Sequence, residues 1–170
     1  MNSSNTLINK VEASGLIVLK PDEKIAFNEF VLLDLKDFLF DGLILKEKKF
    51  REDLQFLPKD NFQNKIILVF CSVDAIIPMW AYMLIASELS SIVKDVIFGT
   101  EEDYRNTIFK RFVESIKPSD FIDKKVVLKG CGKIPIPEWV YMEITLKLRP
   151  VVKSLMFGEP CSTVPIFKQK

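Results

Sequence analysis

The sequence of 170 residues contains no histidine, and this absence excludes several kinds of chemistry. Without an imidazole there is no Ser-His or Cys-His nucleophile pair, no zinc site with histidine ligands and no imidazole proton shuttle. An excess of charge of one sign is also absent, because 24 lysines and arginines balance 23 aspartates and glutamates. The net charge of +1 predicts no general attraction to nucleic acid or to anionic lipid, so we expect neither nucleic acid nor a membrane as a partner.

Long hydrophobic runs and a secretory signal are missing as well. No stretch of about 18 or more apolar residues occurs, so we expect no membrane-spanning helix. Residues 1–15 lack the basic start and apolar core of a signal peptide. We therefore expect a cytoplasmic protein in which Cys71, Cys131 and Cys161 stay reduced. With 48% hydrophobic and 28% charged residues, the chain is suited to fold as a single domain over residues 1–170.

A repeat occupies residues 65–99 and 125–158. The nine residues that begin at Ile77 agree at six positions with the nine that begin at Ile136, an offset of 136 − 77 = 59. Both tryptophans of the chain fall at matched positions in these segments. We interpret the segments as two copies of one unit that arose by duplication.

The first strand-like run of each copy aligns differently. Residues 65–71 match residues 125–131 at an offset of 60, which brings Cys71 opposite Cys131. This alignment predicts that one residue was lost or gained in the loop after the cysteine. It also predicts that the two cysteines occupy equivalent positions.

Each copy predicts the order strand, loop, helix, strand. Short runs rich in β-branched residues have the length of strands. Pro78 and Pro137 mark the helix starts, because proline suits the first helical position and disfavours helix at the residue before it. A further helix between the copies begins after Thr100, whose side chain can cap it. The expected strands of the repeat are residues 65–71, 96–98, 125–129 and 155–157.

Alternating strands and helices favour parallel strands joined by right-handed crossovers. We therefore expect an α/β fold with one parallel sheet, covered by helices on both faces and built from the two duplicated strand-helix-strand units at about 65–99 and 125–158. Residues 1–64 form an N-terminal α+β extension in this prediction. Its expected elements are strands at 16–19 and 30–35, which extend the sheet at an edge, and an amphipathic helix at 45–57.

The cysteines gather at one edge of the predicted sheet. Ligands of open parallel sheets bind beyond the carboxyl ends of the strands. Cys71 and Cys131 end the first strands of the two copies and Cys161 follows the last strand, so we expect the three thiols to converge there. The loops at 72–77 and 132–136 precede helix N-termini, which favour anions and thiolates.

Three interpretations of these cysteines stay open. In the first, the three thiolates hold an iron–sulfur cluster or a soft metal ion, completed by Asp74, Glu159 or an outside ligand. In the second, one cysteine is a redox-active or nucleophilic thiol and another resolves it. In the third, the cysteines are small hydrophobic residues of the core. The other binding residues of the predicted site are their neighbours in the chain, Ser72, Gly130, Gly132 and Ser162.

Three segments carry a resemblance to a known family: residues 37–45 (DFLFDGLIL), 71–83 (CSVDAIIPMWAYM) and 150–168 (PVVKSLMFGEPCSTVPIFK). From about residue 9 to residue 168, the chain resembles the bacterial domain-of-unknown-function family number 2480. The resemblance implies a cytoplasmic bacterial protein of one domain and transfers no catalytic residues. It also implies an association with iron–sulfur cluster assembly of the sulfur-mobilisation type, which favours the cluster or sulfur-handling interpretation.

We therefore predict a non-enzymatic accessory protein that handles iron–sulfur clusters, iron or sulfur for a protein partner through its three cysteines. One alternative is a structural or interaction module, homodimeric through aromatic and apolar surface, whose cysteines lie only in the core. A further alternative is a small thiol-dependent enzyme.

Overall fold

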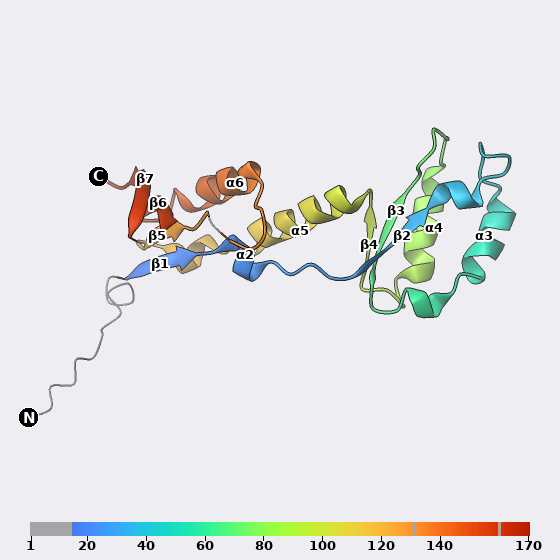
Figure 1. Ribbon diagram of the computed structural model, residues 1–170, viewed down its shortest axis with the longest axis horizontal. Coiled ribbons are helices and arrows are strands. Elements are labelled where there is room, and N and C mark those ends of the chain that lie inside the picture. The colour runs from blue at the N-terminus through green and yellow to red at the C-terminus, as the bar shows by residue number, and fades with distance from the viewer. Residues whose placement is uncertain (1–14, 131, 160) are drawn as a thin grey trace, which may run out of the picture. The chain divides into compact units, whose positions relative to one another are not determined.

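The computed structural model describes residues 15–130, 132–159 and 161–170, which form a mixed α/β fold (Figure 1). The chain divides into two compact units. We call Phe27–Thr107 the central unit, because it is the middle of the sequence, and the remaining described residues the terminal unit. Helix α5 (Glu101–Ser115) contributes residues to both.

The central unit is built on a parallel sheet of three strands in the order β2-β3-β4. Strand β3 lies in the middle, and its residues Ile66 to Val69 are all buried. A strand that is buried on both faces has a continuous apolar run, which explains the sequence Ile-Ile-Leu-Val. The elements are β2 (Phe30–Asp34), η1 (Leu35–Phe38), α3 (Glu47–Gln55), η2 (Lys59–Asn61), β3 (Ile66–Phe70), α4 (Met79–Leu89) and β4 (Asp95–Phe98).

One face of β3 shares a hydrophobic core with α3 and α4. Helix α4 contributes three residues spaced four apart, which lie along one side of a helix. Residues of this core include Phe50, Leu54, Ile67, Val69, Ala81, Ile85 and Leu89.

The terminal unit has a four-stranded sheet in the order β1-β5-β6-β7, in which β7 is antiparallel and the other strands are parallel. Helix α6 buries Val140, Ile144 and Leu148, with the same spacing as the buried residues of α4. The elements are β1 (Leu16–Leu19), α2 (Pro21–Lys24), η3 (Pro118–Phe121), β5 (Lys125–Leu128), α6 (Glu138–Leu148), β6 (Ser154–Glu159) and β7 (Ser162–Lys168).

The predicted α/β class with parallel strands is confirmed, but the prediction of one sheet for both copies is wrong. Strands β3 and β4 lie in one sheet, and β5 and β6 lie in another. The reason is that each copy pairs with its own upstream strand, β2 with β3 and β1 with β5, and so completes a separate three-stranded parallel arrangement. Coverage of each sheet on both faces and an origin by duplication stay predictions. So does the single domain over residues 1–170, because division into compact units does not test whether either unit folds alone.

Strand β7 was not expected from the sequence. It folds back on β6, and the two strands pair from Glu159 and Ser162 outward. Its Pro165 cannot donate a hydrogen bond to a neighbouring strand, but β7 is an edge strand, where proline is tolerated.

The strand register corrects the alignment of the two copies. Ile66 of β3 pairs with Asp95 of β4, and the residues 59 positions later, Lys125 and Ser154, pair in the terminal unit. The offset is therefore 59 in the strands as well, not 60. The alignment slipped by one because Lys124 and Lys125 are both lysines and either can be matched to a single lysine in the first copy.

Candidate functional site

Two of the predicted ligands, Cys71 and Asp74, line one cavity of the central unit, which has a volume of about 580 Å³. The cavity lies where β3 and β4 end, the edge of a parallel sheet that commonly binds ligands. Cys71 is half-buried. Tyr82 of α4 and Phe98 of β4 form part of the wall, with their rings packed edge to face at a centroid distance of 5.4 Å.

The pKa of the Tyr82 phenol depends on its burial and on Cys71. Burial raises the pKa of Tyr82, and the charge of the Cys71 thiolate raises the same pKa further. A negative thiolate disfavours a second negative charge on the phenol. The phenol of Tyr82 therefore stays protonated at neutral pH.

Asp34, at the end of β2, holds the loop that carries Cys71. Its Oδ1 accepts hydrogen bonds from the backbone N–H groups of Ser72 and Lys36, each at 3.0 Å, and its Oδ2 lies 3.3 Å from Nζ of Lys36. Burial raises the pKa of Asp34, but these hydrogen bonds from Ser72 and Lys36 outweigh burial and lower the pKa to about 2. The N–H of Ser72, a predicted binding residue, is thus occupied by Asp34.

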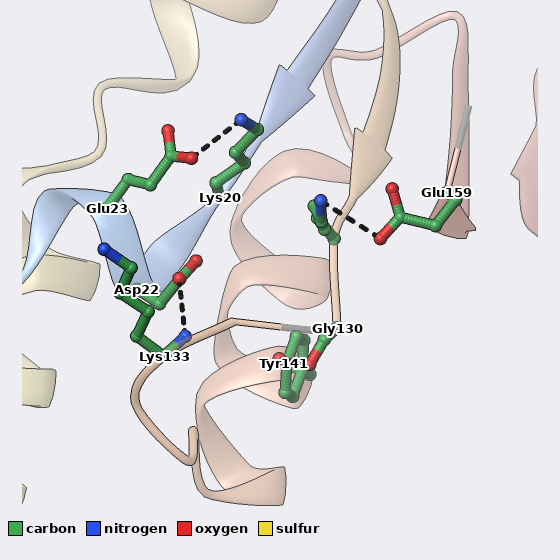
Figure 2. A network of polar contacts seen from close by, with 8 residues as sticks. Lys20, Asp22, Glu23, Gly130, Lys133, Tyr141 and Glu159 are labelled. Atoms are coloured by element: carbon green, nitrogen blue, oxygen red, sulfur yellow. Dashed lines mark hydrogen bonds and ion pairs between the residues drawn. The ribbon is translucent and has the colours of Figure 1, made fainter.

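The terminal unit holds its corresponding loop in a similar way (Figure 2). Oδ2 of Asp22, just after β1, accepts a hydrogen bond of 3.1 Å from the N–H of Lys133. A side chain on Gly132 would collide with the carboxylate of Asp22. Glycine at this predicted binding position therefore lets the backbone come close to Asp22. Sequence reasoning missed both aspartates, although each follows an apolar strand, where a side chain can reach the next loop.

The remaining predicted residues of the terminal unit have structural partners. Oε1 of Glu159 forms an ion pair of 3.2 Å with Lys129. The carbonyl of Gly130 accepts a hydrogen bond of 3.5 Å from the hydroxyl of Tyr141, which Figure 2 shows beside it. Ser162 opens β7.

Cys71 and Cys161 do not lie at the edge of one sheet, contrary to the expectation that the thiols converge there. Cys71 follows β3 of the central sheet, whereas Cys161 is exposed and precedes β7 of the terminal sheet. Cys131 lies outside the described residues. At the offset of 59 that the strands show, Cys71 corresponds to Gly130, so the equivalence of Cys71 and Cys131 stays a prediction. Among the residues that the structure describes, no three cysteine, aspartate or glutamate side chains lie close enough to hold a metal ion together.

Exposed apolar surface forms a second candidate site, on the helices of the repeat. In α4, Met79 and Met83 are 74% and 71% exposed and lie one turn apart, on the same side of the helix; we call this pair the α4 ridge. In the terminal unit, an apolar groove of about 350 Å³ runs along α6, and we call it the α6 groove. The groove is lined by Leu128, Tyr141, Met142, Thr145, Leu146, Phe157 and Ile166.

The chain matches the family described as "Protein of unknown function (DUF2480)" over residues 5–169. Comparison with curated proteins finds no match, and comparison with solved structures finds none either. In the described part of the chain, no helix is long and apolar enough to cross a membrane. The matched residues cover almost the whole sequence, as the resemblance of its three segments predicted, and the chain therefore belongs to the DUF2480 family.

Proposed function

We propose that the chain is a non-enzymatic interaction protein that forms a homodimer through the apolar surfaces of its repeat helices. The observation that carries this proposal is the exposure of large apolar side chains on α4 and α6, at 74% for Met79 and 68% for Leu146. Contiguous exposed apolar surface is typical of interaction sites. Methionine, moreover, is enriched in protein–protein interfaces.

A second copy of the chain is the partner that the chemistry of these surfaces favours. Neither the α4 ridge nor the lining of the α6 groove includes a charged side chain among the described residues. A partner with charged groups at these positions would bury them without an opposite charge, which is unfavourable. Two copies of an uncharged surface bring no such groups together.

Sedimentation velocity of the wild-type chain tests this proposal, measured from concentrations well below to well above the micromolar range. We expect a reversible monomer–dimer equilibrium whose weight-average sedimentation coefficient rises with concentration. A monomer at every concentration would contradict the proposal.

Handling of iron–sulfur clusters, iron or sulfur in the cytoplasm is a second candidate function, proposed for Cys71, Cys131 and Cys161. It is supported by the cavity that Cys71 and Asp74 line together. Anaerobic purification with metal analysis and visible absorption tests it, on the wild type and on the Cys71→Ser and Cys161→Ala variants. Bound metal that both substitutions reduce would support the site, and colourless, metal-free wild-type protein would contradict it.

We also propose that the two copies arose by duplication and that helices cover both faces of each sheet. Ring pairs support the duplication: Tyr82 and Phe98 pack at 5.4 Å and 79°, and their counterparts 59 positions later, Tyr141 and Phe157, pack at 5.5 Å and 89°. The double coverage is supported by burial of consecutive residues along β3 and β5, whose side chains point alternately to opposite faces.

A further inference from the structure

We infer that the α4 ridge of one copy occupies the α6 groove of a second copy, and that the contact occurs twice in a two-fold dimer. This inference rests on the homodimer proposed above. It adds which surface meets which.

The α6 groove accepts an apolar occupant. Apart from Thr145, its walls are aliphatic and aromatic, and the hydroxyl of Tyr141 is already engaged with the carbonyl of Gly130. Met142 and Leu146, which rise from α6 beside the groove, are 66% and 68% exposed. A volume of about 350 Å³ lies at the low end of the range of small-molecule pockets, so it has room for a few side chains.

The α4 ridge has the matching form. Met79 and Met83 project from consecutive turns of one helix, and helix-in-groove recognition uses anchors with this spacing. Methionine is unbranched and flexible, and it adapts to irregular apolar gaps.

The two copies of the repeat differ at the positions that make one surface convex and the other concave. At the offset of 59, Met79 corresponds to Glu138, so α6 has no counterpart of the ridge at this turn, and its exposed apolar pair, Met142 and Leu146, lies one turn further on and lines the groove. Leu146 of the groove corresponds to Ser87. Strand β7, which supplies Ile166 to the groove, has no counterpart beyond β4 in the described central sheet. In the described residues, the ridge therefore belongs to α4 and the groove to α6.

A reciprocal contact satisfies both surfaces. Pairing of groove with groove would leave the methionines of the ridge exposed in the dimer. Pairing of ridge with groove covers both, and a two-fold axis repeats the contact and closes the assembly. Repetition also doubles the area that the contact buries, and stable interfaces bury roughly 1,200–2,000 Å² in total.

The test uses one charge on each surface, in the full-length chain. Met83→Glu alters the ridge, Leu146→Glu alters the groove, and Met79→Glu is a second, independent ridge variant. All three positions are exposed, so the monomers should fold, which circular dichroism and thermal unfolding check. Glu88→Lys and Glu143→Lys are matched controls, which change the charge at exposed positions of the same helices outside the ridge and the groove lining.

We expect each surface variant to weaken dimerisation about a hundredfold, because a carboxylate would be buried against apolar groups. The controls should dimerise like the wild type. A mixture of Met83→Glu and Leu146→Glu chains should form a heterodimer at least about tenfold more stable than either variant homodimer. The heterodimer keeps one unaltered ridge facing one unaltered groove, and a mass tag on one variant identifies it.

Two results would overturn the inference and leave the homodimer standing. Variants that dimerise like the wild type would mean that other surfaces form the dimer. Variants that weaken the dimer without recovery on mixing would mean that like surfaces pair with each other. A wild-type monomer at all concentrations would overturn the proposed function itself.

Discussion

Asp34 joins two loops of the central unit through one carboxylate. It accepts the N–H of Lys36, two residues ahead, and the N–H of Ser72, which belongs to the loop after β3. Asp22 makes the corresponding bond to Lys133 in the terminal unit. Because Ser72 directly follows Cys71, the charge of Asp34 helps to determine where the backbone of that cysteine lies.

Asp34→Asn should lower the free energy of unfolding at neutral pH. It should also make that free energy depend less on pH in the acid range. The pKa of Asp34 is about 2 in the folded chain, against an ordinary value of 3.8 for aspartate. A group whose pKa is lowered by folding stabilises the fold at every pH above its pKa in the unfolded chain. This contribution is lost as the pH falls from about 4 to about 2. The loss amounts to at most about 2 kcal/mol, for a side chain that is 12% exposed. Urea unfolding over a pH series measures it.

The exposed neighbour Asp37 supplies the control for this measurement. Asp37→Asn should change the free energy of unfolding by less than about 0.5 kcal/mol. If Asp34→Asn lost as much stability on acidification as the wild type, the ionised carboxylate would not be the stabilising group.

Cys71→Ala should lower the pKa of Tyr82 while leaving it above its ordinary value. Burial is the larger cause of the raised pKa and remains in the variant, whereas the thiolate charge is removed. The rise of phenolate absorbance with pH measures the change, and Tyr82→Phe identifies which transition belongs to this residue. Cys161→Ala, at an exposed position of the terminal unit, is the control and should leave the titration unchanged. An unchanged Tyr82 in Cys71→Ala would mean that no thiolate forms beside it.

At the scale of elements, local patterns predicted the strands and helices well and their partners poorly. Pro78 and Pro137 each lie one residue before the helix that they were expected to begin. The choice of β2 for one copy and β1 for the other depends on contacts between distant segments, which no local pattern encodes. The prediction of the candidate site failed for the same reason. The cysteines were placed at one edge because all strands were expected to pair in one sheet.

The turns that precede β3 and β5 test whether the two copies are structurally equivalent. Asn64 and Asp123 have left-handed backbone, with φ of 59° and 55°, and their N–H groups donate to the carbonyls of Ile92 and Val151. Asn64→Ala and Asp123→Ala should each lower stability by about 1 kcal/mol, since alanine tolerates this conformation less well than asparagine or aspartate. Chemical denaturation measures both variants. Asn61→Ala, in η2, is the control. Loss of stability in only one of the two turn variants would contradict the structural equivalence of the turns.

At the scale of the whole molecule, α5 links the two cores through one continuous helix of 15 residues. In the central unit, Tyr104 is buried, and its hydroxyl donates to the carbonyl of Asn28 and accepts from the N–H of the same residue. In the terminal unit, Val113 is buried, and Nζ of Lys147 donates to its carbonyl at 2.8 Å. Unfolding of either core would release the helix end on which it packs.

Ile85→Ala and Ile144→Ala should therefore destabilise one cooperative fold, as expected for a single domain over residues 1–170. Both side chains are fully buried at corresponding positions of α4 and α6, and each substitution should lower the free energy of unfolding by about 2–5 kcal/mol. Hydrogen exchange of backbone amides locates the effect. In a single cooperative domain, Ile85→Ala accelerates exchange in α6, and Ile144→Ala accelerates it in α4, because slow amides exchange through the same global opening. Acceleration confined to the unit that carries the substitution, with a second thermal transition, would mean that α5 connects two domains that unfold independently.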